Sequence, residues 1–199
     1  MKSIIRTSTA LLIMILLFSC AKDQHGLTGT YYKGVKLDNS GRITTAGLEK
    51  AFERVDPNID FWDETANYSW SPIKDHGDNY TVVWNGYIKI DKDGEYGFGT
   101  ISDDGSEVWI DDKLVVDNAQ YQWYDWEDNH LHLTPGMHKI SVKFFEGSEF
   151  DGIKFFWLTP GKGKSVIPYQ GTDFSDVPPV YDKGTNWEIV PSSVLFVRN

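Results

Sequence analysis

The chain has 199 residues, a net charge of −10 and a single cysteine. One cysteine excludes an intrachain disulfide, and the acidic charge makes phosphate backbones poor electrostatic partners, so nucleic acid is not an expected ligand. Aromatic residues make up 15% of the chain, which is enough for one well-filled core in a domain of this size.

The N-terminal residues have the composition of an export signal. Lys2 and Arg6 precede the apolar segment 10–18, which is too short to cross a bilayer as a mature helix. The sequence Leu17-Phe18-Ser19-Cys20 then resembles a bacterial lipobox.

From this pattern we expect residues 1–19 to be a signal peptide, Cys20 to carry lipid and residues 20–25 to form a short tether. A chance cysteine at the end of an ordinary signal peptide is the alternative. The expected location is the bacterial cell envelope, as an outer-membrane lipoprotein that could face the cell surface.

Residues 26–199 have the pattern of a single β domain. Short alternating segments are separated by Gly, Asp, Asn and Pro turns, and no sustained helical period follows the leader. Asp91-Lys92-Asp93-Gly94 and Asp111-Asp112-Lys113 predict hairpins, with Asp112 in a left-handed conformation. Alternation over residues 138–144 predicts a half-buried antiparallel strand.

The remaining segments are less regular. Residues 159–186 lack a period and predict a long surface connection, followed by a closing strand near residues 188–196. Residues 48–52 could form one helical turn, which is too short to change the all-β class.

Ser102-Asp103-Asp104-Gly105-Ser106 places two neighbouring acids in a tight bend between predicted strands. A hard cation such as calcium takes about six to eight oxygen ligands, so this pair would need further donors. The alternative is that Asp and Ser side chains only cap the turn through their own backbone.

Four stretches occur in the order and spacing of a known family. They are Trp84-Asn85-Gly86-Tyr87-Ile88, Gly94-Glu95-Tyr96-Gly97-Phe98, residues 102–118 and Pro135-Gly136-Met137-His138-Lys139-Ile140. Together they resemble the PA14 domain family, over about residues 26–196. The resemblance implies an all-β fold, an antiparallel β-sandwich or barrel of the PA14 type.

The resemblance also implies a site. A cis peptide would join Asp103 and Asp104 so that both bind one Ca²⁺, and a second loop at residues 146–152 would add ligands. In that loop Asp151 is the expected carboxylate, with backbone carbonyls of residues 147–149 as helpers, and sugar hydroxyls would complete the shell.

Residues 120–126 contain four aromatic side chains beside the predicted hairpin. Flat rings suit the C–H face of a sugar, and we expect Trp123, Tyr124, Trp126 and Glu149 to contact the ligand. The alternative is that about half of these rings fill the core.

The sequence has no GxSxG, P-loop or GxGxxG motif and no thiol nucleophile after the lipobox. His130 and His132 are followed by no third ligand at zinc spacing, and no HExxH motif is present, so we expect them to be hydrogen-bonded structural histidines. The acidic run over residues 53–64 could offer a glycosidase-like pair, but a hydrated loop is the simpler interpretation. We therefore predict a lipid-anchored, calcium-dependent carbohydrate-binding module that is not an enzyme. The alternatives are a protein-interaction or assembly module of a cell-surface complex and, third, a glycan-acting enzyme.

Overall fold

The computed structural model describes residues 24–62, 73, 77–148, 150–162 and 186–197. The predicted signal peptide, Cys20 and most of the connection over residues 159–186 lie outside these ranges. Among the described residues, no helix is long and apolar enough to cross a membrane.

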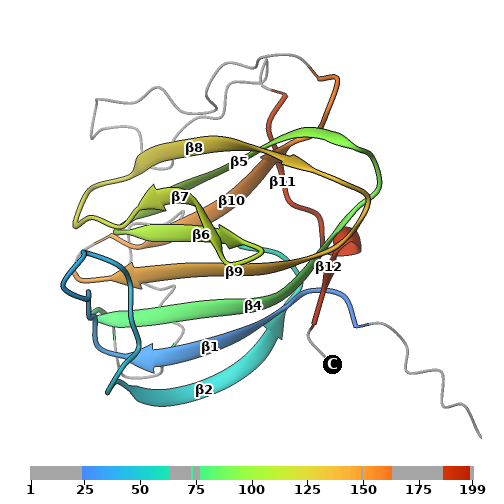
Figure 1. The fold of residues 1–199 in the computed structure, drawn as a ribbon. Coiled ribbons are helices and arrows are strands. Elements are labelled where there is room, and N and C mark those ends of the chain that lie inside the picture. The colour runs from blue at the N-terminus through green and yellow to red at the C-terminus, as the bar shows by residue number, and fades with distance from the viewer. Residues whose placement is uncertain (1–23, 63–72, 74–76, 149, 163–185, 198–199) are drawn as a thin grey trace, which may run out of the picture.

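The described residues form two antiparallel sheets (Figure 1). The larger sheet has the order β2 (Glu49–Asp56), β1 (Leu27–Lys33), β4 (Tyr80–Ile90), β9 (Gly136–Glu146), β6 (Ser106–Ile110) and β7 (Lys113–Asn118), and β12 (Leu195–Phe196) also pairs with β4. The smaller sheet has the order β11 (Glu188–Ile189), β10 (Gly152–Leu158), β5 (Gly94–Asp103) and β8 (Asp125–Leu133), and β3 (Asp60–Trp62) also pairs with β10. The all-β sandwich prediction is confirmed.

The main core lies between the two sheets and follows from strand alternation. On β9, Ile140, Val142 and Phe144 are fully buried, whereas Lys139 is exposed. These residues pack with inward side chains of β4, β5 and β10 in one continuous cluster. Burying such branched and aromatic side chains contributes about 1.5–3 kcal/mol each, which makes this cluster the main source of stability.

A second core cluster covers the smaller sheet. Ile101 and Phe156 are buried there beneath Trp126 and Trp187. Gly99 makes room for this cover, because a Cβ at that position would lie 2.6 Å from Cη2 of Trp126. The absence of a side chain on the strand therefore lets the indole ring pack directly on the sheet.

The turns agree with the sequence pattern in most places. Asp111 and Asp112 both have positive φ, as the tight β6–β7 hairpin requires. Residues 49–56 are a strand, so the helical turn predicted over residues 48–52 is wrong: pairing of β2 with β1 satisfies the backbone there. The closing segment is a short strand, a 3₁₀ turn at Ser192–Val194 and a second short strand.

Candidate functional site

The acidic pair lies at the bend that joins the two sheets. Asp103 ends β5, Asp104 follows it, and β6 begins at Ser106. The peptide between the two acids is cis, as the family resemblance implied. Both side chains are buried.

Glu146 is the third acid of the site. It ends β9, which pairs with β6 so that Phe144 lies opposite Ser106. One carboxylate oxygen from each of Asp103, Asp104 and Glu146 lies within 4.8 Å of the other two. Among the described residues, this is the group of acids with the spacing to hold a metal ion. Sequence reasoning included Glu146 in the second loop but did not choose it as a ligand.

The electrostatics of this cluster favour a cation. Glu146 is 0% exposed, and neither of its carboxylate oxygens has a hydrogen-bond partner. Burial, together with the negative charges of Asp104, Asp103 and Asp151, raises its pKa to about 10. Burial also raises the pKa of Asp104, although backbone N–H groups of Gly147 and Gln122 donate to its carboxylate. A bound cation would supply the compensating charge.

Asp151, the carboxylate predicted in the second loop, lies in that loop immediately before β10. Its side chain is buried, and the hydroxyl of Tyr80 donates to its Oδ2 at 3.0 Å. Its charge acts on Glu146, yet Asp151 is not part of the three-carboxylate cluster. Asp103 and Asp104 are thus grouped with Glu146, the metal ligation expected of Asp151 stays a prediction, and Glu149 lies outside the described residues.

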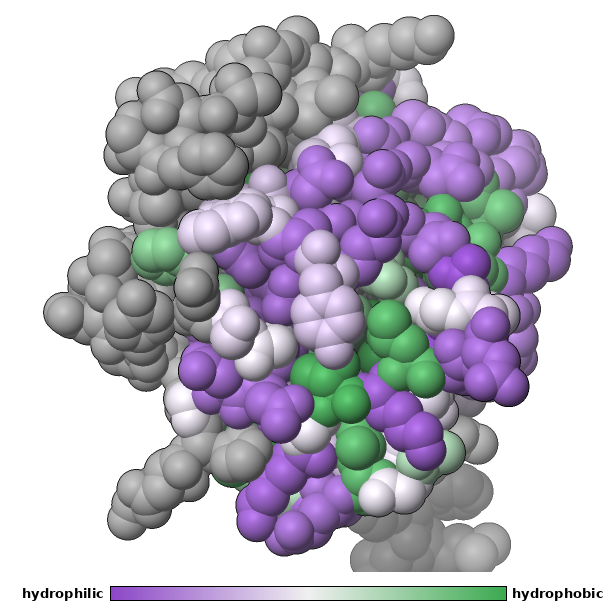
Figure 2. Space-filling model, turned by 90° about the vertical axis from the view of Figure 1, so that its left-hand side faces the viewer, coloured by the Kyte–Doolittle hydropathy of each residue, from purple (hydrophilic) through white to green (hydrophobic). Residues whose placement is uncertain are grey.

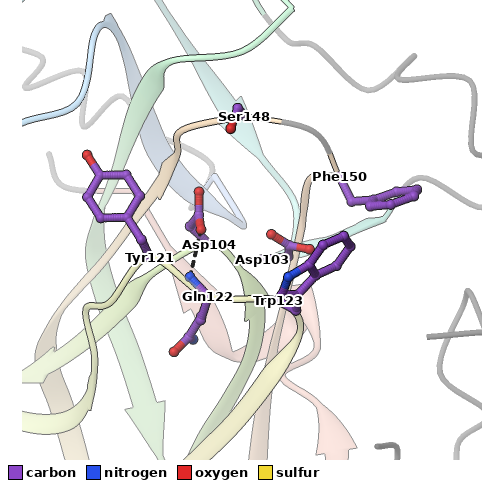
Figure 3. A pocket seen from close by; sticks show the side chains of 7 residues that line it. All are labelled: Asp103, Asp104, Tyr121, Gln122, Trp123, Ser148 and Phe150. Carbon is purple, nitrogen blue, oxygen red and sulfur yellow. Dashed lines mark hydrogen bonds between the residues drawn. The ribbon is translucent and has the colours of Figure 1, made fainter. Parts of the chain in front are cut away.

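A cup of about 240 Å³ opens beside the acids. Its walls are Asp103, Asp104, Tyr121, Gln122, Trp123, Ser148 and Phe150. Figure 3 shows Tyr121 on one side of the acid pair, with Trp123 and Phe150 on the other. The cup is smaller than the roughly 300–1,000 Å³ of a site for a drug-sized ligand, and its size suits one small ring.

The aromatic residues divide between the cup and the core. Trp123, which was predicted to contact the ligand, is 48% exposed and lines the cup, and Tyr121, which was not chosen, is 64% exposed and lines it as well. Trp126 is only 8% exposed, and its indole N–H donates to Asp128. The hydroxyl of Tyr124 donates to the backbone oxygen of Asp151. Neither Trp126 nor Tyr124 is among the residues that line the cup, and the ligand contacts expected of them stay predictions.

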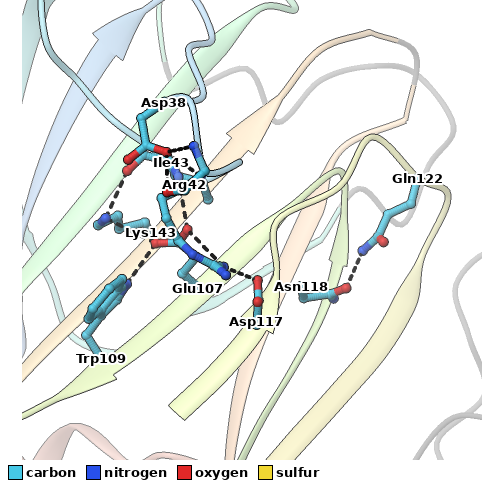
Figure 4. Close-up of polar contacts among 10 residues, drawn as sticks. Asp38, Arg42, Ile43, Glu107, Trp109, Asp117, Asn118, Gln122 and Lys143 are labelled. Carbon is cyan, nitrogen blue, oxygen red and sulfur yellow. Dashed lines mark hydrogen bonds and ion pairs between the residues drawn. The ribbon is translucent and has the colours of Figure 1, made fainter. Parts of the chain in front are cut away.

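Asn118 fixes the loop that carries the rings. It is buried, its Nδ2 donates to the backbone oxygen of Asp125, and its Oδ1 accepts from Nε2 of Gln122 at 2.7 Å (Figure 4). The backbone N–H of Gln122 then donates to Oδ1 of Asp104 at 2.8 Å. Two hydrogen bonds of Gln122 thus fix the loop that carries Tyr121 and Trp123, one to Asn118 at the end of β7 and one to Asp104 of the acid pair.

A buried ion-pair network braces the neighbouring N-terminal loop (Figure 4). Glu107 is 0% exposed and accepts hydrogen bonds from the backbone of Ile43, the indole of Trp109 and the ammonium of Lys143. Arg42 pairs with Asp117 next to it. Every oxygen of Glu107 has a partner, in contrast with Glu146, so this carboxylate has a structural role.

The site lies at the end of the molecule that faces the viewer in Figure 2. Hydrophilic residues dominate this face, and apolar residues gather in a small group near its centre. A third core cluster consists of Ile43, Ala119 and Phe145. The ring of Tyr121 packs against that of Phe145, with 4.9 Å between the ring centroids. The buried ring of Phe145 therefore supports the exposed ring of Tyr121.

Other predicted candidates are placed elsewhere. His130 and His132 lie on the exposed part of β8 near Asp128 and Asp93 respectively. Asp56, from the acidic run, is buried and accepts hydrogen bonds from Tyr31, Trp84 and Arg54. Asp63 and Glu64 lie outside the described residues. The carboxylate of Asp56 therefore has a structural role, since it hydrogen-bonds side chains of the core.

The sequence pattern of the PA14 domain family matches residues 23–171. The chain belongs to the PA14 domain family. The anti-sigma-I factor RsgI3 of Acetivibrio thermocellus is 31% identical over 150 residues, which make up 74% of this chain and 21% of that protein. The chain thus spans about a fifth of this curated relative.

Solved structures share the fold. An anti-sigma factor domain-containing protein from Clostridium clariflavum aligns with a TM-score of 0.63 and 23% identity, over 88% of this chain and 48% of that one. A PA14 sugar-binding domain from an RTX adhesin aligns with a TM-score of 0.59 and 16% identity, over 87% of this chain and 99% of that domain.

Proposed function

We propose that this PA14 domain binds carbohydrate through a calcium ion held by Asp103, Asp104 and Glu146. The observation that carries the proposal is the buried carboxylate of Glu146, which has no hydrogen-bond partner and lies beside two further acids. Hard oxygen ligands in a flexible arrangement suit calcium, and backbone carbonyls of the following loop could complete its shell.

The bound ion would act as a Lewis acid toward sugar hydroxyls. This chain's own residues would then choose the ligand. The exposed rings of Tyr121 and Trp123 offer flat faces for sugar C–H groups, and Ser148 and Gln122 stand at the rim to hydrogen-bond hydroxyls. Binding rather than cleavage is proposed, because the described acids near the cup converge on one point instead of facing each other across a cleft.

One structural relative is itself named a sugar-binding domain. This supports the proposal as an analogy of fold, since identity to that domain is 16%. The anti-sigma factor relatives suggest a wider setting, in which a domain of this kind is one part of a larger protein.

A glycan array read with calcium and with chelator tests the proposal. The matched variant carries Asp103→Asn and Asp104→Asn together, which removes two charges while keeping side-chain size. We expect calcium-dependent glycan binding in the unchanged protein and none in the variant, with both proteins folded by circular dichroism. Glycan binding that is equal in both proteins would refute the metal-dependent site.

A protein-interaction module is the second candidate. Two large rings, Tyr121 and Trp123, are about half exposed or more at one edge, and such rings often anchor protein interfaces. A protein partner that binds equally well with and without calcium, and loses binding when Trp123 is changed, would favour this candidate.

We also propose that lipid on Cys20 holds the domain at the bacterial cell envelope. The proposal stems from the lipobox-like sequence that ends at this cysteine. Metabolic labelling with a fatty acid should mark the unchanged protein and leave Cys20→Ala unlabelled. Label that persists in the variant would overturn the assignment.

A further inference from the structure

The loop that carries Tyr121 and Trp123, residues 119–124, joins two strands that are not paired with each other. β7 ends at Asn118 on the edge of the larger sheet, and β8 begins at Asp125 on the edge of the smaller sheet. The loop therefore crosses from one sheet to the other outside both hydrogen-bonded ladders. A loop in this position keeps one conformation only where hydrogen bonds and packing fix it.

Asn118 joins the two ends of this loop. Its Nδ2 donates to the backbone oxygen of Asp125 at 3.1 Å, so one side chain connects the last residue of β7 with the first residue of β8. The same nitrogen lies 3.4 Å from Oγ of Ser102, which precedes the acid pair on β5. Asn118 is 1% exposed, and an amide is seldom buried to that extent unless its polar atoms are paired.

The amide oxygen of Asn118 is directed at the middle of the loop. It accepts a hydrogen bond from Nε2 of Gln122 at 2.7 Å (Figure 4). Gln122 stands between Tyr121 and Trp123 in the sequence, and its backbone N–H donates to Oδ1 of Asp104 at 2.8 Å. The position of both rings relative to the acid pair therefore depends on two consecutive hydrogen bonds that begin at Asn118.

Asn118 is separate from the metal cluster and from the walls of the cup. The cluster consists of Asp103, Asp104 and Glu146, and Asn118 is not among the residues that line the cup. Loss of its side chain would therefore remove no oxygen ligand from the ion and no direct contact from a sugar. It would instead release the loop that carries the rings.

We propose that Asn118 is a positioning residue for the cup, which holds the rings of Tyr121 and Trp123 beside Asp104 through Gln122. This role deepens the proposed function and rests on it, because the two rings are the flat surface offered to a sugar. A ring that is already held in place loses less conformational freedom when a ligand binds, so a fixed loop favours affinity.

Amide hydrogen exchange, measured by NMR in chelator and without glycan, tests the proposal. Asn118→Leu keeps a side chain of similar size and removes its hydrogen bonds, so the Gln122 N–H should exchange about five- to fiftyfold faster. The N–H of Gly147 is the internal control, because it donates to the other oxygen of Asp104 from a different loop. The N–H of Val142, on the central strand β9, reports on global stability.

Gln122→Met is a second variant, which removes only the hydrogen bond to Asn118 and changes a residue that is not fully buried. Exchange at residue 122, corrected for its intrinsic rate, should again rise. The double variant should show no larger rise than Asn118→Leu alone, because both side chains act through one bond.

Tyr96→Phe is the matched control variant. It removes a side-chain hydrogen bond to a backbone oxygen at the other end of β5, and should leave exchange at Gln122 unchanged. Unchanged exchange at residue 122 in Gln122→Met, or an equal rise at Gln122, Gly147 and Val142 in Asn118→Leu, would overturn the proposal. Because no glycan is present, a failed glycan array would refute the carbohydrate function without changing this result.

Discussion

The backbone N–H of Gly147 donates to Oδ2 of Asp104 at 2.8 Å, and a Cβ at Gly147 would lie 3.0 Å from the same oxygen. That Cβ would also lie 2.8 Å from Cε1 of Tyr121. Asp104, a proposed metal ligand, and Tyr121, which lines the cup, therefore both lie close to Gly147, where a side chain would collide with them.

Gly147→Ala should therefore disturb both the ion and the sugar. The added methyl group would push Tyr121 and the Asp104 carboxylate apart, at a cost of about 1–3 kcal/mol spread over binding and stability. Calorimetric titration with calcium should show weaker binding. Gly77→Ala is the control, because no atom lies within 4 Å of a Cβ there; equal calcium affinity in both variants would contradict the assignment.

Glu146→Gln should have opposite effects with and without calcium. The metal-free fold keeps Glu146 protonated at neutral pH, since its pKa is raised to about 10, whereas the unfolded chain ionises it. Its contribution to stability is therefore fully present below the ordinary glutamate pKa and declines as pH rises toward about 10.

A glutamine needs no proton, and its amide can donate to Asp103 or Asp104. Denaturant unfolding at pH 7 in chelator should show the variant more stable by about 1–3 kcal/mol. In millimolar calcium the variant should gain less stability than the unchanged protein. A variant that is less stable in chelator and gains as much from calcium would remove Glu146 from the site.

Trp123→Ala should separate sugar binding from metal binding. Loss of an exposed ring at the cup should cost about 1–3 kcal/mol of sugar affinity, while calcium affinity stays unchanged because the ring supplies no oxygen ligand. Met137→Ala removes an exposed apolar side chain far from the cup and should change neither affinity. Isothermal titration with the best glycan from the array measures both; an unchanged sugar affinity would exclude Trp123 from the site.

Much of the fold could be predicted from the sequence, because the hairpins and alternating strands are local patterns. The acid pair could be found for the same reason, since Asp103 and Asp104 are adjacent. Glu146 could not be chosen, because it follows Phe144 and Phe145 at a strand end and meets the acid pair only through pairing of β9 with β6. The position of Trp126 also depends on distant residues, since Trp187 and Phe156 bury it.

Asp111→Asn should reveal a pH-dependent contribution of His138. Burial lowers the pKa of His138, but its hydrogen bonds to Asp111 and to the Thr134 backbone outweigh this and raise it above the ordinary value. Protonated His138 therefore stabilises the fold below the unfolded pKa, and this contribution is lost as pH rises through the folded pKa.

Asparagine keeps the left-handed backbone and an acceptor for the N–H of Lys139 while removing the charge. Urea unfolding at pH 5.5 and pH 8.5 should show a difference between the two proteins of up to about 1 kcal/mol at the lower pH and a smaller one at the higher pH. A difference that does not change with pH would contradict the proposed ion pair.

Titration of one glycan into the protein, before and after removal of calcium by chelator, tests the calcium-dependent carbohydrate site most directly. A calcium-dependent site should give saturable binding with calcium, no binding at the cup after chelation, and full recovery when calcium is restored. Binding of that glycan with the same affinity in chelator would contradict a calcium-dependent carbohydrate site at Asp103, Asp104 and Glu146.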